Sequence, residues 1–251
     1  MNDLKKQWLE EEKAAQIHGW DFSYLDGRFY TGDDDLDWDY RQLILDRLSP
    51  DKRILDIDTG GGEFLLSLGH PFPMTAATEG YPPNVELCRS KLLPLGIDFR
   101  PWAEGEALPF EDESFDMVID RHGSYDIPEI WRVLKKGGIF ITQQVGGDND
   151  RELAEMLCPG RKPLYEGHYL SSELERFRAQ GFSIADSGEC YRPIEFYDSG
   201  ALVWFARVIP WEFPDFSVDN NFEQLCAAHA VIQEKGRLSG RIHRFMITAV
   251  K

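Results

Sequence analysis

Between residues 53 and 142 the sequence alternates short apolar runs with segments of helical periodicity. The apolar runs span residues 54–57, 74–78, 97–100, 115–119 and 139–142. Helices are predicted between them, over residues 64–68, 84–93 and 127–134. A strand, a helix and a further strand form a βαβ unit, and successive units build a parallel sheet with helices on both faces. The pattern therefore predicts a doubly wound α/β fold.

The regions on either side of this stretch have a looser pattern. Residues 1–40 are expected to form an N-terminal helical and aromatic cap with a helix over residues 4–18, and a helix over residues 38–48 is expected to precede the sheet. Residues 41–251 are expected to form the main domain, with lid elements around residues 188–238. Further helices are predicted over residues 152–157, 171–180 with Ser171 as its N-cap, 201–209 and 222–234. Strands are predicted over residues 182–185 and 242–250.

The first apolar run leads into a glycine-rich turn, Asp58-Thr59-Gly60-Gly61-Gly62, which precedes a predicted helix. Glycine has no side chain and adopts positive φ readily, so a ligand can approach the backbone N–H groups of such a turn closely. The dinucleotide fingerprint G-x-G-x-x-G, started at Gly60, needs a third glycine where Leu65 stands. A dinucleotide-dependent enzyme is therefore the weaker alternative.

The same stretch resembles the first motif of the class I S-adenosylmethionine-dependent methyltransferases, an acidic residue followed by G-x-G-x-G at the end of the first strand. In that pattern Asp56 is the acid, Gly60 and Gly62 are the second and third glycines, and Asp58 replaces the first. Aspartate is among the residues that tolerate a left-handed backbone. Its carboxylate could pair with the ammonium group of the cofactor or repel the cofactor's carboxylate. Thr59 is counted with the turn as a cofactor contact.

The second predicted strand ends at Thr78-Glu79-Gly80. Ribose-binding folds place a carboxylate about 20 residues beyond the glycine turn, where it accepts hydrogen bonds from the ribose hydroxyls. Glu79 is predicted to take this role, with Gly80 beside it at the cofactor site.

The stretch from Ala103 to Asp116 closely resembles the family's sequence G-D-A-x-x-L-P-F-x-x-x-S-F-D. The resemblance implies that Glu104 takes the place of the acid that contacts the adenine amino group, and that Gly105 offers a backbone N–H toward the ring. It also implies a seven-stranded, mostly parallel sheet of the Rossmann-like methyltransferase type. Residues 242–250 would form its antiparallel last strand, and S-adenosyl-L-methionine would be the cofactor.

The fourth predicted strand ends at residues 120–126, which in this fold face the transferred methyl group. His122 could accept a proton from the acceptor, orient the acceptor, or serve a structural role. Tyr125 is a second catalytic candidate, and Arg121 is counted with the cofactor contacts. Asp126 could cap the following helix.

The next segment contains glycines 137 and 138, which are expected to cap the end of that helix. Gln143 and Gln144 follow the fifth strand at the edge of the sheet where ligands gather, so one of them could reach the acceptor. Residues 209–216 are interpreted as part of a cap over a pocket. An apolar pocket could be lined by aromatic residues at Trp20, Phe22, Tyr24, Tyr30, Trp204 and Trp211.

Charge and composition bear on the acceptor. The formal net charge of −17 opposes binding to phosphate backbones, so the expected acceptor is a small molecule and a nucleic acid is not favoured. The charged N-terminal segment is unlike a signal peptide and predicts a cytoplasmic protein, and no apolar segment is long enough to predict membrane insertion. The four cysteines lie far apart, so no metal site is predicted. The oligomeric state is left open, and a non-catalytic binding module is the remaining alternative.

Overall fold

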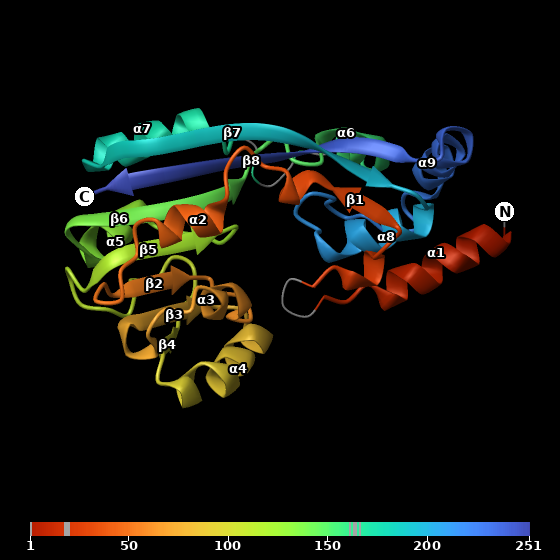
Figure 1. Ribbon diagram of the computed structural model, residues 1–251. Helices are drawn as coiled ribbons and strands as arrows, with labels where there is room; N and C mark the ends of the chain where they lie inside the picture. The colour runs from red at the N-terminus through yellow and green to blue at the C-terminus, as the bar shows by residue number, and fades with distance from the viewer. Residues whose placement is uncertain (1, 18–20, 161, 163–164, 166) are drawn as a thin grey trace.

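The computed structural model describes residues 2–17, 21–160, 162, 165 and 167–251. Eight strands in these ranges form one mixed sheet in the order β1-β7-β8-β6-β5-β2-β3-β4 (Figure 1). The strands are β1 (Phe29–Thr31), β2 (Ile54–Ile57), β3 (Thr75–Glu79), β4 (Asp98–Pro101), β5 (Phe115–Arg121), β6 (Leu134–Val145), β7 (Ser183–Phe196) and β8 (Leu238–Val250). Strands β4, β3, β2, β5 and β6 are mutually parallel, whereas β8 runs antiparallel to both β6 and β7. The predicted α/β fold is confirmed.

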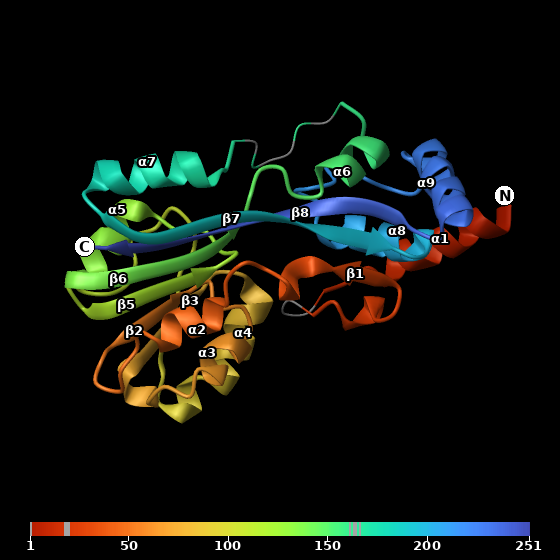
Figure 2. The ribbon, with the colours of Figure 1, turned by 45° about the horizontal axis from the view of Figure 1, so that its top comes forward.

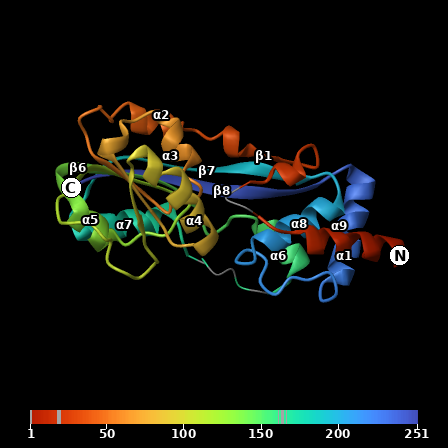
Figure 3. The same cartoon turned by 90° about the horizontal axis from the view of Figure 1, so that it is seen from below.

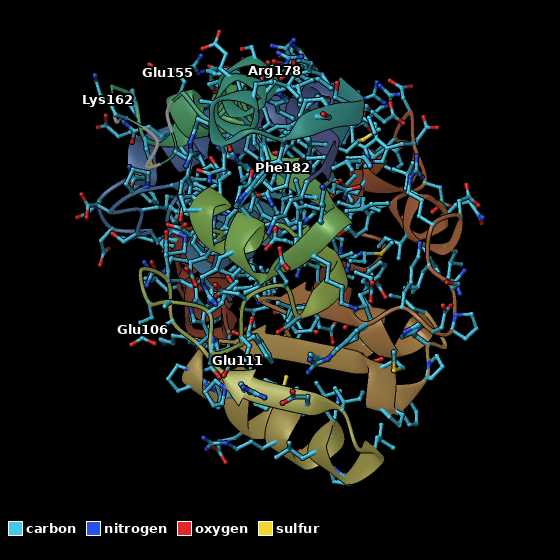
Figure 4. All side chains as sticks on the ribbon, turned by 90° about the vertical axis from the view of Figure 1, so that its left-hand side faces the viewer. Glu106, Glu111, Glu155, Lys162, Arg178 and Phe182 are labelled. Atoms are coloured by element: carbon cyan, nitrogen blue, oxygen red, sulfur yellow. The ribbon has the colours of Figure 1, made fainter. Side chains whose placement is uncertain are left out.

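Helices cover both faces of the parallel part of the sheet (Figure 3). One face packs against α2 (Tyr40–Leu45), α3 (Glu63–Ser67) and α4 (Pro82–Lys91), and the other against α5 (Ile127–Val133) and α7 (Leu170–Gln180). Successive side chains of a strand point to opposite faces, so Ile54 joins the first core and Leu55 the second. Phe182 lies in the second core with its ring 4.9 Å from that of Trp131, while Arg178 of α7 lies on the outer surface (Figure 4).

The far ends of β7 and β8 extend beyond the parallel strands and carry a helical layer (Figures 1 and 2). This layer contains α1 (Asn2–Ala14), α6 (Arg151–Leu157), α8 (Ser199–Val208) and α9 (Phe222–Lys235). Its separate core includes Trp8, Trp204 and Phe213, each at most 1% exposed. The N-terminal segment therefore packs on the segments expected to form a lid. In the described ranges no helix is both long and apolar enough to cross a membrane.

Several local predictions need correction. The sheet has an eighth strand, β1, which pairs with β7 from a segment that shows few strand signals in the sequence. Strand β7 continues far beyond residue 185 because β8 pairs with it along its whole length. Glycines 137 and 138 do not cap α5, which ends at Val133, but lie within β6. Helix α7 has Tyr169 rather than Ser171 at its N-cap.

Two further predictions concern helix ends. Helix α1 ends at Ala14, and His18, the last residue of the predicted helix, lies outside the described residues. Asp126 caps α5 as expected, because its carboxylate accepts the backbone N–H of Glu129. The antiparallel strand predicted over residues 242–250 is confirmed as part of β8.

A buried ion pair connects the N-terminal segment to β8. The guanidinium of Arg244, which is 7% exposed, donates to both carboxylate oxygens of Asp33, at 2.7 and 3.0 Å. Breaking a fully buried pair typically costs about 3–5 kcal/mol, and partial exposure of the partner reduces this. Asp33→Ala is therefore expected to lower the free energy of unfolding by about 2–3 kcal/mol in chemical denaturation. The exposed neighbour provides a control, since Asp34→Ala should change it by less than about 0.5 kcal/mol.

Candidate active site

Two cavities meet at the carboxyl ends of the parallel strands. Strands β3 and β4 follow β2 on one side of it in the sheet, and β5 and β6 lie on its other side. The strand order therefore reverses between β2 and β5, and this position is the topological switch point of the sheet. Ligands of open α/β sheets bind in the crevice outside such a point. The smaller cavity has a volume of about 230 Å³ and the larger about 470 Å³, and Asp58, His122 and Gly123 line both.

Gly123 keeps the junction between the two cavities open. A Cβ atom at this position would lie 2.5 Å from the Cβ of Asp58 and 2.6 Å from Oδ2 of Asp120. Real Cβ atoms do not approach other atoms so closely, and both neighbours belong to the packed ends of β2 and β5. A residue without a side chain is therefore required here.

The glycine turn forms one wall of the smaller cavity. Its backbone is left-handed at Asp58, Gly60 and Gly62, with φ values of 50°, 63° and 79°. A Cβ at Gly60 would have nothing within 4 Å, so the turn is open on that side, and Gly62 is the N-cap of α3. The turn presents its backbone to the cavity as the sequence predicts for a ligand-binding loop.

Glu79 holds this turn in place from the end of β3. Its side chain accepts the backbone N–H groups of Gly60 at 2.8 Å, Gly80 at 2.9 Å and Tyr81 at 2.8 Å. The residue is 5% exposed and lines the smaller cavity. The side-chain amide of Asn84 is a fourth donor to this carboxylate, at 3.5 Å. An ionised carboxylate has about four acceptor positions, so a ligand hydroxyl would replace this long fourth bond.

Three further carboxylates gather behind the turn. Burial raises the pKa of Asp56 to about 7 and that of Asp58 to about 6, and it raises the pKa of Asp120 well above its usual range. Thr59 Oγ1 donates to Asp56 at 2.6 Å, and the Ser124 backbone N–H donates to Asp58 at 3.0 Å. Each negative charge makes ionisation of the others harder, so the group favours a cationic ligand.

Arg121 brings positive charge to the same cavity. Its guanidinium lies 4.5 Å from the ring centroid of Phe64, the residue that follows Glu63 at the start of α3. Both side chains line the smaller cavity. Acids on one side and a guanidinium on the other suit a ligand that carries both charges, such as an amino acid.

The hydrogen bonds of His122 define its protonation. The indole N–H of Trp38 donates to Gln143 Oε1 at 2.8 Å, so the amide nitrogen of Gln143 is the donor toward His122 Nε2, 3.1 Å away. Nε2 is therefore an acceptor and the ring proton lies on Nδ1. Burial, together with the charges of Arg244 and Arg121, lowers the pKa of His122 well below its usual value. The neutral ring is better suited to orienting an acceptor than to removing its proton.

Tyr125 lines the larger cavity, but its hydroxyl is already engaged. It donates to Glu173 Oε2 at 3.0 Å, and Glu173 also accepts from Arg176 at 2.7 Å. Burial and the charge of Glu173 raise the pKa of Tyr125 well above its usual value, so the phenol stays neutral. These bonds attach α7 to the wall of the cavity.

The remaining predicted cofactor residues are distributed differently. Glu104 lines the larger cavity rather than the smaller one that Glu79 lines. Gly62, Gly80 and Gly105 line neither cavity. At Gly80 a Cβ would lie 2.6 Å from the carbonyl oxygen of Trp102, so close packing between the ends of β3 and β4 accounts for this glycine.

The predicted aromatic pocket is largely absent. Trp211 lines the larger cavity, as the interpretation of residues 209–216 as a cap requires. Phe22 and Trp204 instead pack edge to face in the core of the helical layer, with ring centroids 5.9 Å apart. The remaining positions lie on the surface or outside the described residues: Tyr24 is 47% exposed, Tyr30 is 43% exposed, and Trp20 is not described.

Other residues at the two cavities were not singled out from the sequence. Phe64 and Asn84 line the smaller one, and the larger one is lined by His168, Glu173 and Glu212 among others. Asn84 lies near the start of a helix that was correctly predicted, just after the carboxyl end of β3. A polar side chain at this edge of the sheet could have been used to predict it as a ligand contact. Phe64 lies in the helix predicted over residues 64–68. The three residues named at the larger cavity lie in loops or in the first turn of α7, and their position depends on tertiary packing. Of the two glutamines named, Gln144 lines the larger cavity and Gln143 contacts His122.

The protein family and the individual relatives that this chain resembles are methyltransferases. Residues 55–142 match the methyltransferase domain family. A probable phthiotriol/phenolphthiotriol dimycocerosates methyltransferase 2 of Mycobacterium ulcerans is 34% identical over 104 residues, 38% of this chain and 40% of that protein. A demethylmenaquinone methyltransferase of Thermus thermophilus is 34% identical over 118 residues, 43% of this chain and 54% of that protein. The chain thus spans about half or less of the length of these relatives.

Solved structures resemble the whole fold. A putative methyltransferase from Bacillus halodurans aligns with a TM-score of 0.59 at 18% identity, covering 85% of this chain and 98% of that one. A functionally unknown protein from Deinococcus radiodurans aligns with a TM-score of 0.58 at 14% identity, covering 99% and 97%. The fold and its glycine turn define a Rossmann-like methyltransferase domain. Residues 55–142 therefore match the methyltransferase domain family, and the fold around them is that of the Rossmann-like methyltransferases.

Proposed function

We propose that this protein transfers a methyl group from S-adenosylmethionine to a small-molecule acceptor. The observation that carries the proposal is the pair of cavities joined at Asp58, His122 and Gly123. A cofactor on one side of this junction and an acceptor on the other would have their reacting atoms at the common wall. Holding two reactants in line accounts for a large part of the rate enhancement of such a transfer.

The residues of the smaller cavity fit the functional groups of the cofactor. Glu79 would accept the ribose hydroxyls, Asp58 and Asp56 would face the cationic groups, and Arg121 would pair with the methionine carboxylate. Glu104, at the start of the larger cavity, remains a candidate for the adenine contact. When bound, the cofactor supplies a methyl group that is already activated by the positive charge on sulfur.

The acceptor would occupy the larger cavity. His122 Nδ1–H would orient it near the junction, while Trp211 and Tyr125 contribute apolar surface that excludes water. The net charge of −17 argues against a nucleic acid. The names of the relatives, which refer to phthiotriol dimycocerosates and demethylmenaquinone, support an organic molecule as acceptor.

Calorimetry with S-adenosylhomocysteine, the demethylated cofactor, and with NAD⁺ tests the proposal. We expect binding of the homocysteine compound with a Kd in the micromolar range and no binding of NAD⁺. A folded protein that binds neither compound would favour a non-catalytic module, and preference for NAD⁺ would favour a dinucleotide-dependent enzyme. Circular dichroism on the same sample establishes that the protein is folded.

A further inference from the structure

The larger cavity has more carboxylates than cations. Glu173 is neutralised by Arg176 at 2.7 Å, with His168 a further 3.5 Å contact. Glu212 differs, because the partner found for its carboxylate within the described ranges is the neutral amide of Asn149, at 3.2 Å. The cavity therefore contains a carboxylate that forms no salt bridge within the described ranges, although the charge of Arg244 acts on it.

Glu212 is also well buried. It is 8% exposed and lies on α8's C-terminal side, in the loop that closes the cavity. Arg244, the cation whose charge acts on Glu212, is already engaged with Asp33 through two hydrogen bonds. A second acid, Asp150, lies beside Glu212 and is 1% exposed. Buried charges in proteins are normally paired, so a cation is missing from this wall of the cavity.

The raised pKa values of Glu212 and Asp150 agree with the lack of a cation beside them. Burial raises the pKa of Glu212 to about 7, although Asn149 and Arg244 act in the opposite direction. Burial and the charge of Glu212 raise the pKa of Asp150 well above its usual range. A cationic ligand would stabilise the ionised form of Glu212 and would be bound more tightly in return.

Aromatic side chains accompany the carboxylate. Trp211 precedes Glu212 and lines the same cavity, as does Tyr165, which is close enough to Glu212 to feel its charge. Indole and phenol faces attract organic cations, and the attraction is strongest for tryptophan. A carboxylate and two aromatic residues in the same cavity are the two kinds of group that recognise an ammonium ion.

Resting on the proposed function, we propose that the methyl acceptor is a small organic amine bound as its ammonium ion, with Glu212 as the counter-ion. The ammonium group, which has no lone pair to accept a methyl group, would lie against Glu212 and Trp211. A different, nucleophilic atom of the same molecule would reach the junction at Asp58, where it would bond to the methyl carbon as the bond from that carbon to the cofactor sulfur breaks. Glu212 is then a specificity-determining residue of the acceptor cavity. The apolar character expected from the aromatic content of the sequence is replaced by a requirement for positive charge.

The experiment compares three probes of similar shape on protein saturated with S-adenosylhomocysteine. The probes are 2-phenylethylamine, 2-phenylethanol and 3-phenylpropionate, and calorimetry measures each affinity at pH 8. We expect the amine to bind at least tenfold more tightly than the alcohol, and the carboxylate not to bind. Equal binding of the alcohol, preference for the carboxylate, or no binding of the amine would overturn the inference.

Two variants assign the charge requirement to Glu212. Glu212→Gln keeps the shape and removes the charge, so amine affinity should fall at least tenfold while S-adenosylhomocysteine affinity stays within twofold. Glu111→Gln, at an exposed position (Figure 4), is the control and should change neither. Because the variant removes an uncompensated buried charge, it should be no less stable than the wild type at pH 8. Unchanged amine affinity in Glu212→Gln would contradict the assignment.

The pH dependence supplies a further readout. The charged or titratable groups that act on Glu212 are Asp150, Arg244 and Tyr165, and comparison with Glu212→Gln separates the ionisation of Glu212 from their effects. Amine affinity should rise between pH 6 and 8 as Glu212 ionises, and Glu212→Gln should remove the rise.

Failure of S-adenosylhomocysteine to bind would count against the proposed function, whereas normal binding of that compound without amine binding would count against this inference alone.

Discussion

Glu79→Ala is expected to weaken binding of S-adenosylhomocysteine more than 100-fold. In the unliganded protein Glu79 accepts the N–H groups of Gly60, Gly80 and Tyr81, so it both shapes the turn and faces the ligand. Hydrogen bonds to a charged group contribute about 1.5–3 kcal/mol each, and about 1.4 kcal/mol corresponds to tenfold in affinity. Loss of one such bond to the ligand, together with loss of the bond that holds the turn at Gly60, is therefore sufficient for the expected effect. Calorimetry on the folded variant measures it.

A nearby glutamate provides the matched control for this substitution. Glu86 lies on α4, its side chain is 72% exposed, and it pairs with Arg89 on the same helix. Glu86→Ala should leave the affinity within about twofold, because exposed pairs of this kind contribute little. If Glu79→Ala bound S-adenosylhomocysteine within threefold of the wild type, the assignment of the smaller cavity to the nucleoside would be wrong.

The preference for S-adenosylmethionine over S-adenosylhomocysteine is expected to increase about tenfold between pH 5 and pH 8. The two compounds differ by the positive charge on sulfur, and Asp58 and Asp56, with pKa values of about 6 and 7, become ionised in this interval. Two unit charges 4 Å apart attract by about 4 kcal/mol at an effective dielectric constant of 20, so even a screened interaction reaches about 1.4 kcal/mol. Calorimetry with both compounds across the pH range measures the ratio.

Asp58→Asn separates the contribution of the first carboxylate, because asparagine has the same shape and tolerates a left-handed backbone. The ratio should then vary less with pH, and what remains belongs to Asp56. Asp112→Asn, at a side chain that is 75% exposed, should leave the profile unchanged. An equal or larger pH dependence in Asp58→Asn would show that this carboxylate does not face the sulfonium group.

The same pKa shifts determine how the stability of the unliganded protein varies with pH. Both carboxyl groups have folded-state pKa values above the ordinary value of 3.8, so the folded state holds their protons more tightly than the unfolded state does. Their contribution favours the folded state at low pH and is lost as the pH rises from about 4 to about 7. A ligand cation reverses this loss, which links cofactor binding to stability at neutral pH.

The residues that line the smaller cavity could be predicted because their signals are local. Strand β2, the turn with Asp58 and Gly60, and helix α3 are consecutive in the chain, and Glu79 ends the next strand. Parallel strands bring their carboxyl ends to one edge, so the order of these elements was enough to place their side chains together. Strand β1 was missed because three residues of an aromatic, acidic segment become a strand through pairing with β7.

The charge and hydrogen bonding of the larger cavity depend on contacts between segments that are far apart in the sequence. The protonation of His122 follows from Trp38 and Gln143, which lie 84 and 21 residues away along the chain. Glu212 lacks a cation because Asp33 already occupies Arg244. Hydrophobic periodicity indicates which face of an element is buried, but it carries no information about which element packs against it. The sequence by itself therefore determined the α/β domain and the edge of the sheet at which the smaller cavity lies, and tertiary packing decided the charge, shape and hydrogen bonds of the larger cavity.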